Sequence, residues 1–239
     1  MEHMAHTITT EDTQMNNNRV LLHGTITDDP RYSHEMFGEG FYELTLSVGR
    51  LSNINDAIPI TLSEKLIKEH KISRGSELIV KGQFRSYNKL VAGRSKLMLT
   101  VFVREIVEDN PTQNPNIIEL TGYICKAPIY RTTPFNREIT DILVAVNRAY
   151  NKSDYIPAIA WGKNARLGES LKIGDRINLS GRIQSREYQK RLDDGTTETR
   201  VAYEISINRL SQEPIESAFE SSDTAFSPNE DVMQEILGA

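Results

Sequence analysis

The sequence predicts a mainly β protein made of two tandem five-stranded barrels, each with one short helix, followed by a disordered acidic C-terminal tail. Three observations predict this. The chain repeats itself at an offset of 98–99 residues. Each copy consists mainly of short runs of Val, Ile, Leu and Thr that alternate with polar residues. After Gln212 the composition changes to Ser, Glu, Asp and Pro, which is typical of a disordered segment.

The repeat is carried by glycines, prolines and strand segments that recur in the same order. The matching pairs are Gly24 and Gly122, Pro30 and Pro128, 46–50 and 144–148, 58–60 and 156–158, Gly75 and Gly174, and 82–86 and 181–185. One such match could arise by chance, but several matches that occur in the same order in both copies indicate a tandem duplication.

The elements of each copy follow from its periodicity. Strands are expected over 42–48, 78–82 and 97–103 in the first copy, and over 142–146, 176–183 and 201–207 in the second. A helix is expected between the third and fourth strands of each copy, over 63–70 with Ser63 as its N-cap and near 163–171. This element order is that of an OB-fold barrel. An immunoglobulin-like sandwich would require about seven strands and no such helix.

The domain boundaries follow from composition. We expect a disordered N-terminus over 1–17, a first barrel over 18–108, and a polar linker over 109–116 that contains two prolines. A second barrel should cover 117–211, and the acidic tail 212–239. Because the linker is short, the two barrels should sit side by side.

The charges are segregated along the chain. The net charge is −5, but residues 213–239 contain seven acids and no Lys or Arg. Residues 111–212 contain 15 basic and 11 acidic side chains, whereas 15–110 contain 13 basic and 12 acidic ones. The second copy therefore suits a polyanionic partner better than the first.

The sequence offers no catalytic grouping. The five histidines have no metal-ligand spacing, no Gly-rich phosphate loop is present, and no nucleophile–base constellation occurs, so we expect no enzyme, metal or cofactor. Cys125 is the only cysteine and cannot form an internal disulfide, which favours a reducing cytoplasm. A lone thiol of this kind is usually a small core residue. The sequence contains no run of about 18 apolar residues, so it predicts no membrane span.

Residues 119–210 resemble the bacterial single-stranded DNA-binding protein family. The resemblance rests on Leu120-Thr121-Gly122, Arg131-Thr132-Thr133-Pro134, 143–148, 155–163 and Gly181-Arg182-Ile183-Gln184-Ser185-Arg186-Glu187-Tyr188. It implies sequence-independent binding and protection of single-stranded DNA in replication, recombination and repair. It also implies a nucleoid-associated, non-membrane protein.

A site that binds any single strand uses base faces and phosphates, which all sequences share. Four aromatic residues stand where the family places its stacking residues: Tyr150, Tyr155, Trp161 and Tyr188. Basic residues interleaved with them are expected to contact phosphates: Arg131, Arg148, Lys152, Lys163, Arg182, Arg186, Lys190 and Arg191. The alternative is that these aromatics are half-buried core residues and that the charges are merely solvated.

The first copy lacks the stacking residues. The repeat places Ser52, Ala57, Ser63 and Lys89 at the positions of the four aromatics, and only Tyr87 stands close to one of them. We therefore expect the first barrel to be structural or to bind DNA weakly. Because family members usually assemble four OB domains, the resemblance also implies a homodimer.

The end of the chain has the pattern of a short amphipathic helix. Ser227-Pro228-Asn229-Glu230 has the form of a capping box, and Val232, Met233, Ile236 and Leu237 then form one apolar stripe. The family usually ends in an acidic segment with a hydrophobic tip that recruits replication and repair proteins, so these four residues are a candidate partner-binding site. The terminal Pro-Phe of the family is absent here. A tail that only improves solubility remains an alternative.

Two other functions stay open at this point. The barrels could mainly bind proteins, as a replication-restart or recombination accessory module. The chain could also bind RNA, because stacking alone does not distinguish ribose from deoxyribose.

Overall fold

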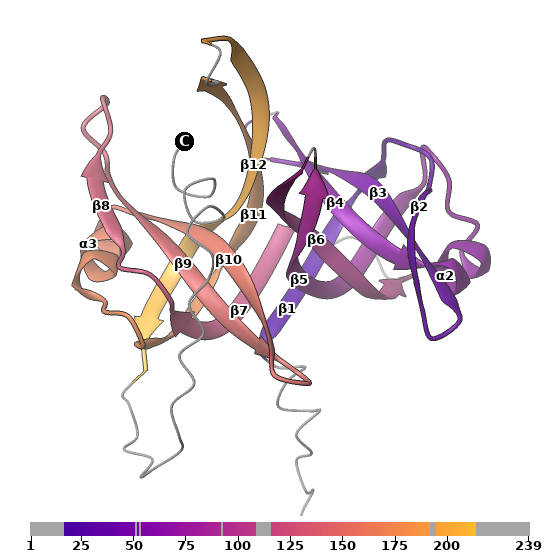
Figure 1. The fold of residues 1–239 in the computed structure, drawn as a ribbon, viewed down its shortest axis with the longest axis horizontal. Helices are drawn as coiled ribbons and strands as arrows, with labels where there is room; N and C mark the ends of the chain where they lie inside the picture. Colours follow the sequence, from indigo (N-terminus) through magenta and orange to yellow (C-terminus); the bar gives the residue numbers. More distant parts are fainter. Residues whose placement is uncertain are drawn as a thin grey trace, which may run out of the picture.

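The structure is a computed structural model that describes residues 17–50, 52, 54–91, 93–108, 116–191 and 195–213. Two β barrels follow one another along the chain and lie side by side (Figure 1). The expected N-terminal segment up to residue 16, most of the linker and the apolar stripe at 232–237 lie outside the described residues. None of the described helices is long and apolar enough to cross a membrane.

The first barrel is a closed ring of five strands. Its chain order is β1 (Asn18–Ile26), β2 (Arg31–Met36), β3 (Glu39–Gly49), β4 (Asn55–Ser63), α2 (Glu64–Glu69), β5 (Glu77–Val91) and β6 (Arg94–Val107). The ring runs β1-β3-β4-β6-β5 and returns to β1, and β4 pairs with β6 in parallel. These pairings are those of the OB-fold.

The second barrel repeats this topology. Its elements are β7 (Asn116–Ile124), β8 (Ile129–Thr132), β9 (Glu138–Arg148), β10 (Lys152–Trp161), α3 (Lys163–Ser170), β11 (Arg176–Arg191) and β12 (Thr197–Gln212). The ring runs β7-β9-β10-β12-β11, with β10 and β12 parallel. The predicted pair of tandem OB-folds is confirmed.

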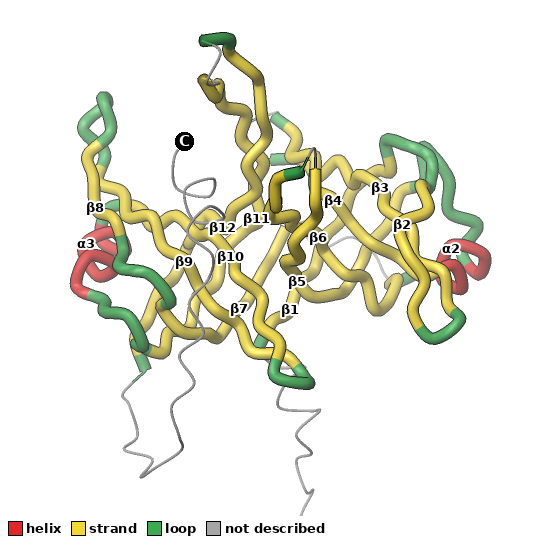
Figure 2. Tube along the Cα trace, in the orientation of Figure 1, coloured by secondary structure: helices red, strands yellow, loops and turns green. Residues whose placement is uncertain are grey.

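The structure contains more strands, and longer ones, than the sequence predicted. A sixth strand, β2 in one copy and β8 in the other, pairs with the end of β3 or β9 outside the ring. The β5–β6 and β11–β12 hairpins run far beyond the expected ends at residues 82 and 183, and both project from the barrels (Figure 2). Both projections carry many polar residues, so an apolar alternation does not mark them.

Two repeated glycines have a steric reason. Gly82 and Gly181 each sit at a β-bulge, and a Cβ on either would collide with the carbonyl oxygen of Phe102 or Ser206 on the paired strand. The bulge therefore requires glycine in both copies.

The helices occur where the sequence predicted them. Ser63 caps α2, since its Oγ accepts a hydrogen bond from the backbone N–H of Leu66 at 3.3 Å. Gly162 precedes α3 without a side-chain cap. At the other end of the second barrel, Glu213 still belongs to the ordered fold, because its carboxylate pairs with Arg176 at 2.9 Å. From residue 214 on, the expected acidic tail lies outside the described residues.

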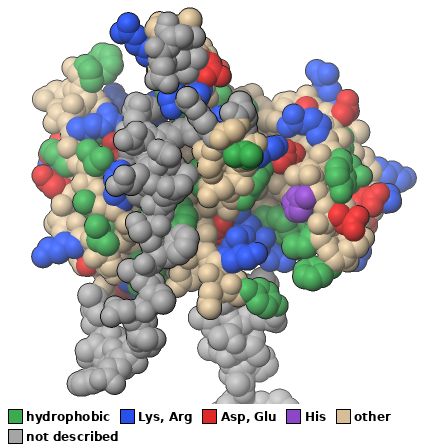
Figure 3. All heavy atoms as spheres, viewed as in Figure 1, with side chains coloured by type: hydrophobic (Ala, Val, Ile, Leu, Met, Phe, Trp, Pro, Cys, Tyr) green, Lys and Arg blue, Asp and Glu red, His purple; other side chains and the backbone are tan. Residues whose placement is uncertain are grey.

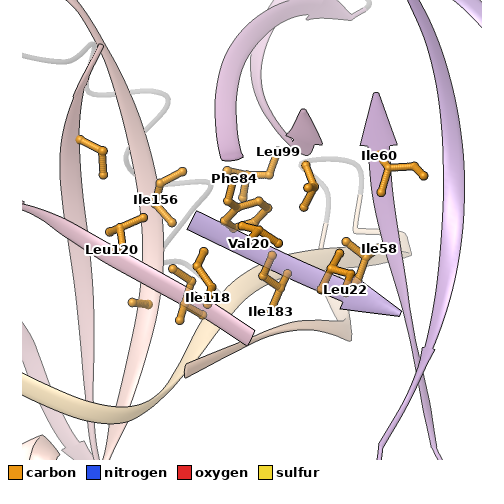
Figure 4. Close-up of a cluster of buried hydrophobic side chains, with 14 of the residues drawn as sticks. Val20, Leu22, Ile58, Ile60, Phe84, Leu99, Ile118, Leu120, Ile156 and Ile183 are labelled. Atoms are coloured by element: carbon orange, nitrogen blue, oxygen red, sulfur yellow. The ribbon is translucent and has the colours of Figure 1, made fainter. Parts of the chain in front are cut away.

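One hydrophobic core spans both barrels. Strands β1 and β7 pair antiparallel, with Val20 opposite Ile118, and join the barrels into one twelve-stranded sheet. Phe84 of the first barrel and Ile183 of the second are fully buried in the same cluster as this pair (Figure 4). The two barrels are therefore a single packed unit, which agrees with the expected side-by-side arrangement.

Reciprocal hydrogen bonds also fix the two barrels. Asp56 of the first barrel accepts from the N–H of Ser185 in the second, and Asp154 of the second accepts from the N–H of Ser86 in the first, each at 2.7 Å. Both carboxylates are fully buried. Because the two contacts are related by the internal repeat, the barrels are arranged around an approximate twofold axis.

Candidate nucleic-acid interface

Tyr155 lies in a groove between the two barrels, which we call the Tyr155 groove. Its volume is about 750 Å³, and Arg148 and Lys152 of the second barrel line it together with Tyr155. The opposite wall comes from the first barrel and includes Tyr87 and Leu97. An aromatic ring and two cations therefore face one hollow, as base stacking with phosphate contacts requires.

Tyr188 lies in a second groove, the Tyr188 groove, of about 340 Å³. Its walls are Pro157 and residues 198–204 of the second barrel and residues 96–99 of the first. Leu97 lines both grooves, so the two are neighbours along the β5–β6 hairpin. Tyr155 and Tyr188 thus lie on one continuous stretch of surface at the junction of the barrels.

Trp161 lies apart from these grooves. Its side chain is 37% exposed and lines a separate hollow of about 470 Å³ with Arg137 and Glu138. Tyr155 and Trp161 are both on β10, and six residues of strand span roughly 20 Å. The two aromatic side chains therefore belong to different parts of the surface. The indole is partly exposed and is not enclosed in the core.

Tyr150 is the most open of the four aromatics. It occupies the turn between β9 and β10, its φ is +61°, and its side chain is 93% exposed. No described residue stacks on its ring. It could contact a base only at the outer end of the Tyr155 groove, which Asn151 also lines.

Half of the predicted phosphate-binding residues already have a carboxylate partner. Arg131 pairs with Asp141 at 2.8 Å, and Arg148 lies 3.3 Å from Asp154. The other two pairs are Arg182 with Asp56 at 3.5 Å and Arg186 with Glu204 at 3.7 Å. Arg186 also lies over the ring of Tyr188, at 5.8 Å from its centroid.

The remaining four have no carboxylate partner among the residues that the structure describes: Lys152, Lys163, Lys190 and Arg191. Of these, only Lys152 lines a groove with a predicted stacking residue. Lys163 begins α3 next to Trp161, and Lys190 and Arg191 lie on the projecting β11–β12 hairpin. Basic side chains lie on both barrels on the face shown in Figure 3.

Sequence reasoning assigned no site residue to the first barrel, yet its hairpin forms a wall of each junction groove. Tyr87 is 37% exposed, and its hydroxyl donates to Glu43 at 2.9 Å. Burial, and then this hydrogen bond, raise the pKa of Tyr87. Leu97 begins a strand that the sequence predicted, but the strand pattern does not show that this residue faces the other barrel.

Two exposed phenylalanines were also missed. Phe37 and Phe135 occupy equivalent turns, after β2 and after β8, and both side chains are almost wholly exposed. The signal was present, since the repeat offset aligns them. Asn136, next to Phe135, lines the hollow of Trp161.

Cys125 lines none of the three hollows described above. It follows the end of β7 and is half-buried rather than a full core residue. Its thiol donates to the carbonyl of Leu143 at 3.3 Å. Burial raises the pKa of this thiol to about 11. Within the described ranges, no group of three His, Cys, Asp or Glu side chains could hold a metal ion.

Residues 115–211 match the model of the single-strand binding protein family. A single-stranded DNA-binding protein of Clostridium tetani is 35% identical over 88 residues, which cover 34% of this chain and 59% of that protein. Single-stranded DNA-binding protein 3 of Streptococcus agalactiae serotype V is 28% identical over 121 residues, 46% of this chain and 88% of that protein. This chain thus spans only about three fifths of the first relative's length.

The fold of both barrels has a match among solved structures. The wild-type single-stranded DNA-binding protein from Thermus aquaticus superposes with a TM-score of 0.60 at 18% identity, and 85% of this chain is covered. A deletion mutant of the same protein gives a TM-score of 0.63 at 19% identity, over 85% of this chain and 98% of that one. The two-barrel arrangement is therefore an established fold.

Proposed function

This chain belongs, through its second barrel, to the single-strand binding protein family, and from that premise we propose that it binds single-stranded DNA without regard to sequence. Bases would stack on Tyr155, Trp161 and Tyr188, and phosphates would contact basic residues beside them. Stacking is worth roughly 1–3 kcal/mol per base, so a few platforms can supply most of a micromolar affinity.

One observation carries the proposal. Tyr155 and Tyr188 face two adjoining grooves at the barrel junction, and Arg148 and Lys152 lie beside Tyr155. A structural aromatic would be closed off by neighbouring side chains, whereas these two line open grooves.

The first barrel has a larger part in this proposal than its sequence suggested. It lacks stacking residues at the repeat positions, but residues 96–99 and Tyr87 complete the grooves. We therefore assign it a wall of the binding site rather than a purely structural role.

The cellular role is proposed on the same premise. The chain would protect single strands during replication, recombination and repair in the bacterial cytoplasm. It would assemble as a homodimer with four barrels, and its acidic tail would recruit other proteins through Val232, Met233, Ile236 and Leu237. Molar mass in solution, with and without a long oligonucleotide, tests the assembly.

Fluorescence titration tests the binding. Trp161 is the only tryptophan, so oligo-dT stacked on it should quench the emission. Tyr155→Ala and Tyr188→Ala should each weaken binding by about 5- to 150-fold, the equivalent of 1–3 kcal/mol. Tyr32→Ala is the matched control, because Tyr32 is an exposed tyrosine that lines neither groove.

Three outcomes would decide against the proposal or change it. Absence of quenching, with unchanged affinity in both tyrosine variants, would remove the stacking mechanism. Absence of any binding to oligo-dT would favour a module that mainly binds proteins. Tighter binding to oligo-U than to oligo-dT would redirect the proposal to RNA.

A further inference from the structure

We propose that Arg85 and Arg104 of the first barrel, together with Arg148 of the second, form a phosphate site at the barrel junction, through which a bound strand passes from one barrel to the other. This inference rests on the proposed function and adds to Arg148, which the sequence already suggested, two arginines of the first barrel that it did not.

The first two arginines are held together by an aromatic ring. The guanidinium carbon of Arg85 lies 4.2 Å from the ring centroid of Phe102, and that of Arg104 lies 5.2 Å from it. A cation over an aromatic face is attracted to the ring, so Phe102 gathers two like charges that would otherwise repel one another. The Nη2 of Arg85 also donates a hydrogen bond to the Oε1 of Gln83 at 2.7 Å, which fixes the orientation of the guanidinium group.

These two guanidinium groups lack an anionic partner. Within the described part of the chain, neither Arg85 nor Arg104 forms an ion pair with a carboxylate. The Nε of Arg85 is buried and has no hydrogen-bond partner there. A buried donor without a partner is uncommon and costs free energy, which an incoming anion would recover.

The charge balance at this position is positive. Burial, together with the neighbouring charges of Arg104 and Arg148, lowers the pKa of Arg85 to about 10. Asp154 is the one carboxylate that counters them, and it already accepts from Ser86 and lies 3.3 Å from Arg148. A phosphodiester would therefore meet three cations and one carboxylate, whose Oδ1 is occupied by the Ser86 N–H.

The repeat supplies an internal comparison. At the equivalent junction position, Arg50 and Arg182 both pair with Asp56. Gln184 stands where the first copy has Arg85, and its amide donates to Glu204 at 2.6 Å. The cations there are paired, so the unpaired cations occur on one side of the junction only. That asymmetry favours a ligand on the unpaired side.

Phosphate is the ligand that this chemistry recognises. Guanidinium groups form forked hydrogen bonds to phosphate oxygens, and they remain charged when partly buried. Arg148 lines the Tyr155 groove and its charge acts on Arg85, so the site adjoins the proposed stacking surface through Arg148. A strand that leaves Tyr155 would reach the first barrel across these arginines.

The salt dependence of oligo-dT binding tests the inference. Each phosphate contact on a single strand contributes about 0.7 to the slope of log K against log salt. The double variant R85Q/R104Q should lower that slope by about 1.4 for an oligonucleotide of roughly 35 nucleotides, which spans both barrels. An oligonucleotide of about 8 nucleotides, which fits one barrel, should be nearly unaffected.

The control removes two charges elsewhere on the same barrel. Lys65 on α2 and Arg74 before β5 are exposed and lie away from the junction, so K65Q/R74Q should keep the wild-type slope. Arg104→Gln alone alters an exposed side chain and should lower the slope by about 0.7, even if loss of Arg85 impairs folding.

The outcomes separate the two proposals. If the wild-type chain binds the long oligonucleotide but R104Q and R85Q/R104Q keep its affinity and slope, the junction site does not exist. An equal decrease of the slope in K65Q/R74Q would also overturn it, because the decrease would then come from the overall charge and not from this site. If the wild-type chain fails to bind either oligonucleotide, the proposed function itself is wrong.

Discussion

Asp56 and Asp154 are a matched pair of residues that sequence reasoning had no means to place. Their hydrogen-bond partners, Ser185 and Ser86, lie in the opposite barrel and far away along the chain. Burying a carboxylate costs free energy, which its hydrogen bonds offset. Each aspartate accepts such a bond from the opposite barrel, so the two residues link the barrels in a defined arrangement.

Asp154→Ala should destabilise the folded chain by about 3 kcal/mol, because it leaves the Ser86 N–H and the Arg148 guanidinium without their buried partner. Urea unfolding measures this loss. Glu105→Ala removes an exposed pair with Lys81 and should change stability by less than about 1 kcal/mol. Equal effects in the two variants would show that burial of Asp154 is unimportant.

Cys125 should be a slow nucleophile. Its pKa is raised to about 11 from an ordinary 9, so at pH 8 the thiolate fraction is about 100-fold lower than in an unfolded chain. A thiol-reactive chromogenic disulfide should therefore modify the native protein much more slowly than the protein in urea. Comparable rates in the two states would mean that the thiol is open to solvent.

At the scale of elements, the position just before the helix has a different role in each copy. Ser63 caps α2 in the first copy, while Trp161 stands at the equivalent place in the second, where α3 has no side-chain cap. A helix of this length depends strongly on its cap. The first copy thus has a capped helix at the position where the second has an open indole.

Ser63→Ala should cost about 1 kcal/mol of stability and lower the melting temperature by roughly 2–4 °C. Calorimetry measures the change. Ser52→Ala, in the exposed turn before β4, should leave the melting temperature unchanged. A Ser63 variant as stable as the Ser52 variant would mean that the cap contributes nothing.

The barrels could be predicted from the sequence, but the interface only in part. Gly82 and Gly181 recur because the bulge excludes a side chain, so these matches in the repeat reflect a steric requirement of the fold. The lengths of the β5–β6 and β11–β12 hairpins were missed because their projecting ends have little apolar surface to bury. Tyr188 was found as a residue, but the wall opposite it comes from the other copy, which no pattern within one copy reveals.

At the scale of the molecule, the continuous core predicts that the two barrels unfold together. Ile118 is fully buried where β7 pairs with β1. Ile118→Ala should destabilise the whole chain by about 2–5 kcal/mol, and Trp161 fluorescence, which reports the second barrel, should follow the same transition as circular dichroism. Two separate transitions in either protein would show that the barrels are independent.

The pairing of β1 with β7 has a consequence for how the protein behaves on dilution. Two barrels that met as separate chains would fall apart at low concentration, and they would exchange partners with related chains in the same cell. Here the peptide link keeps each barrel permanently at a high effective concentration for the other. The pair therefore persists at any expression level, and each barrel can change its surface without having to remain complementary to a copy of itself.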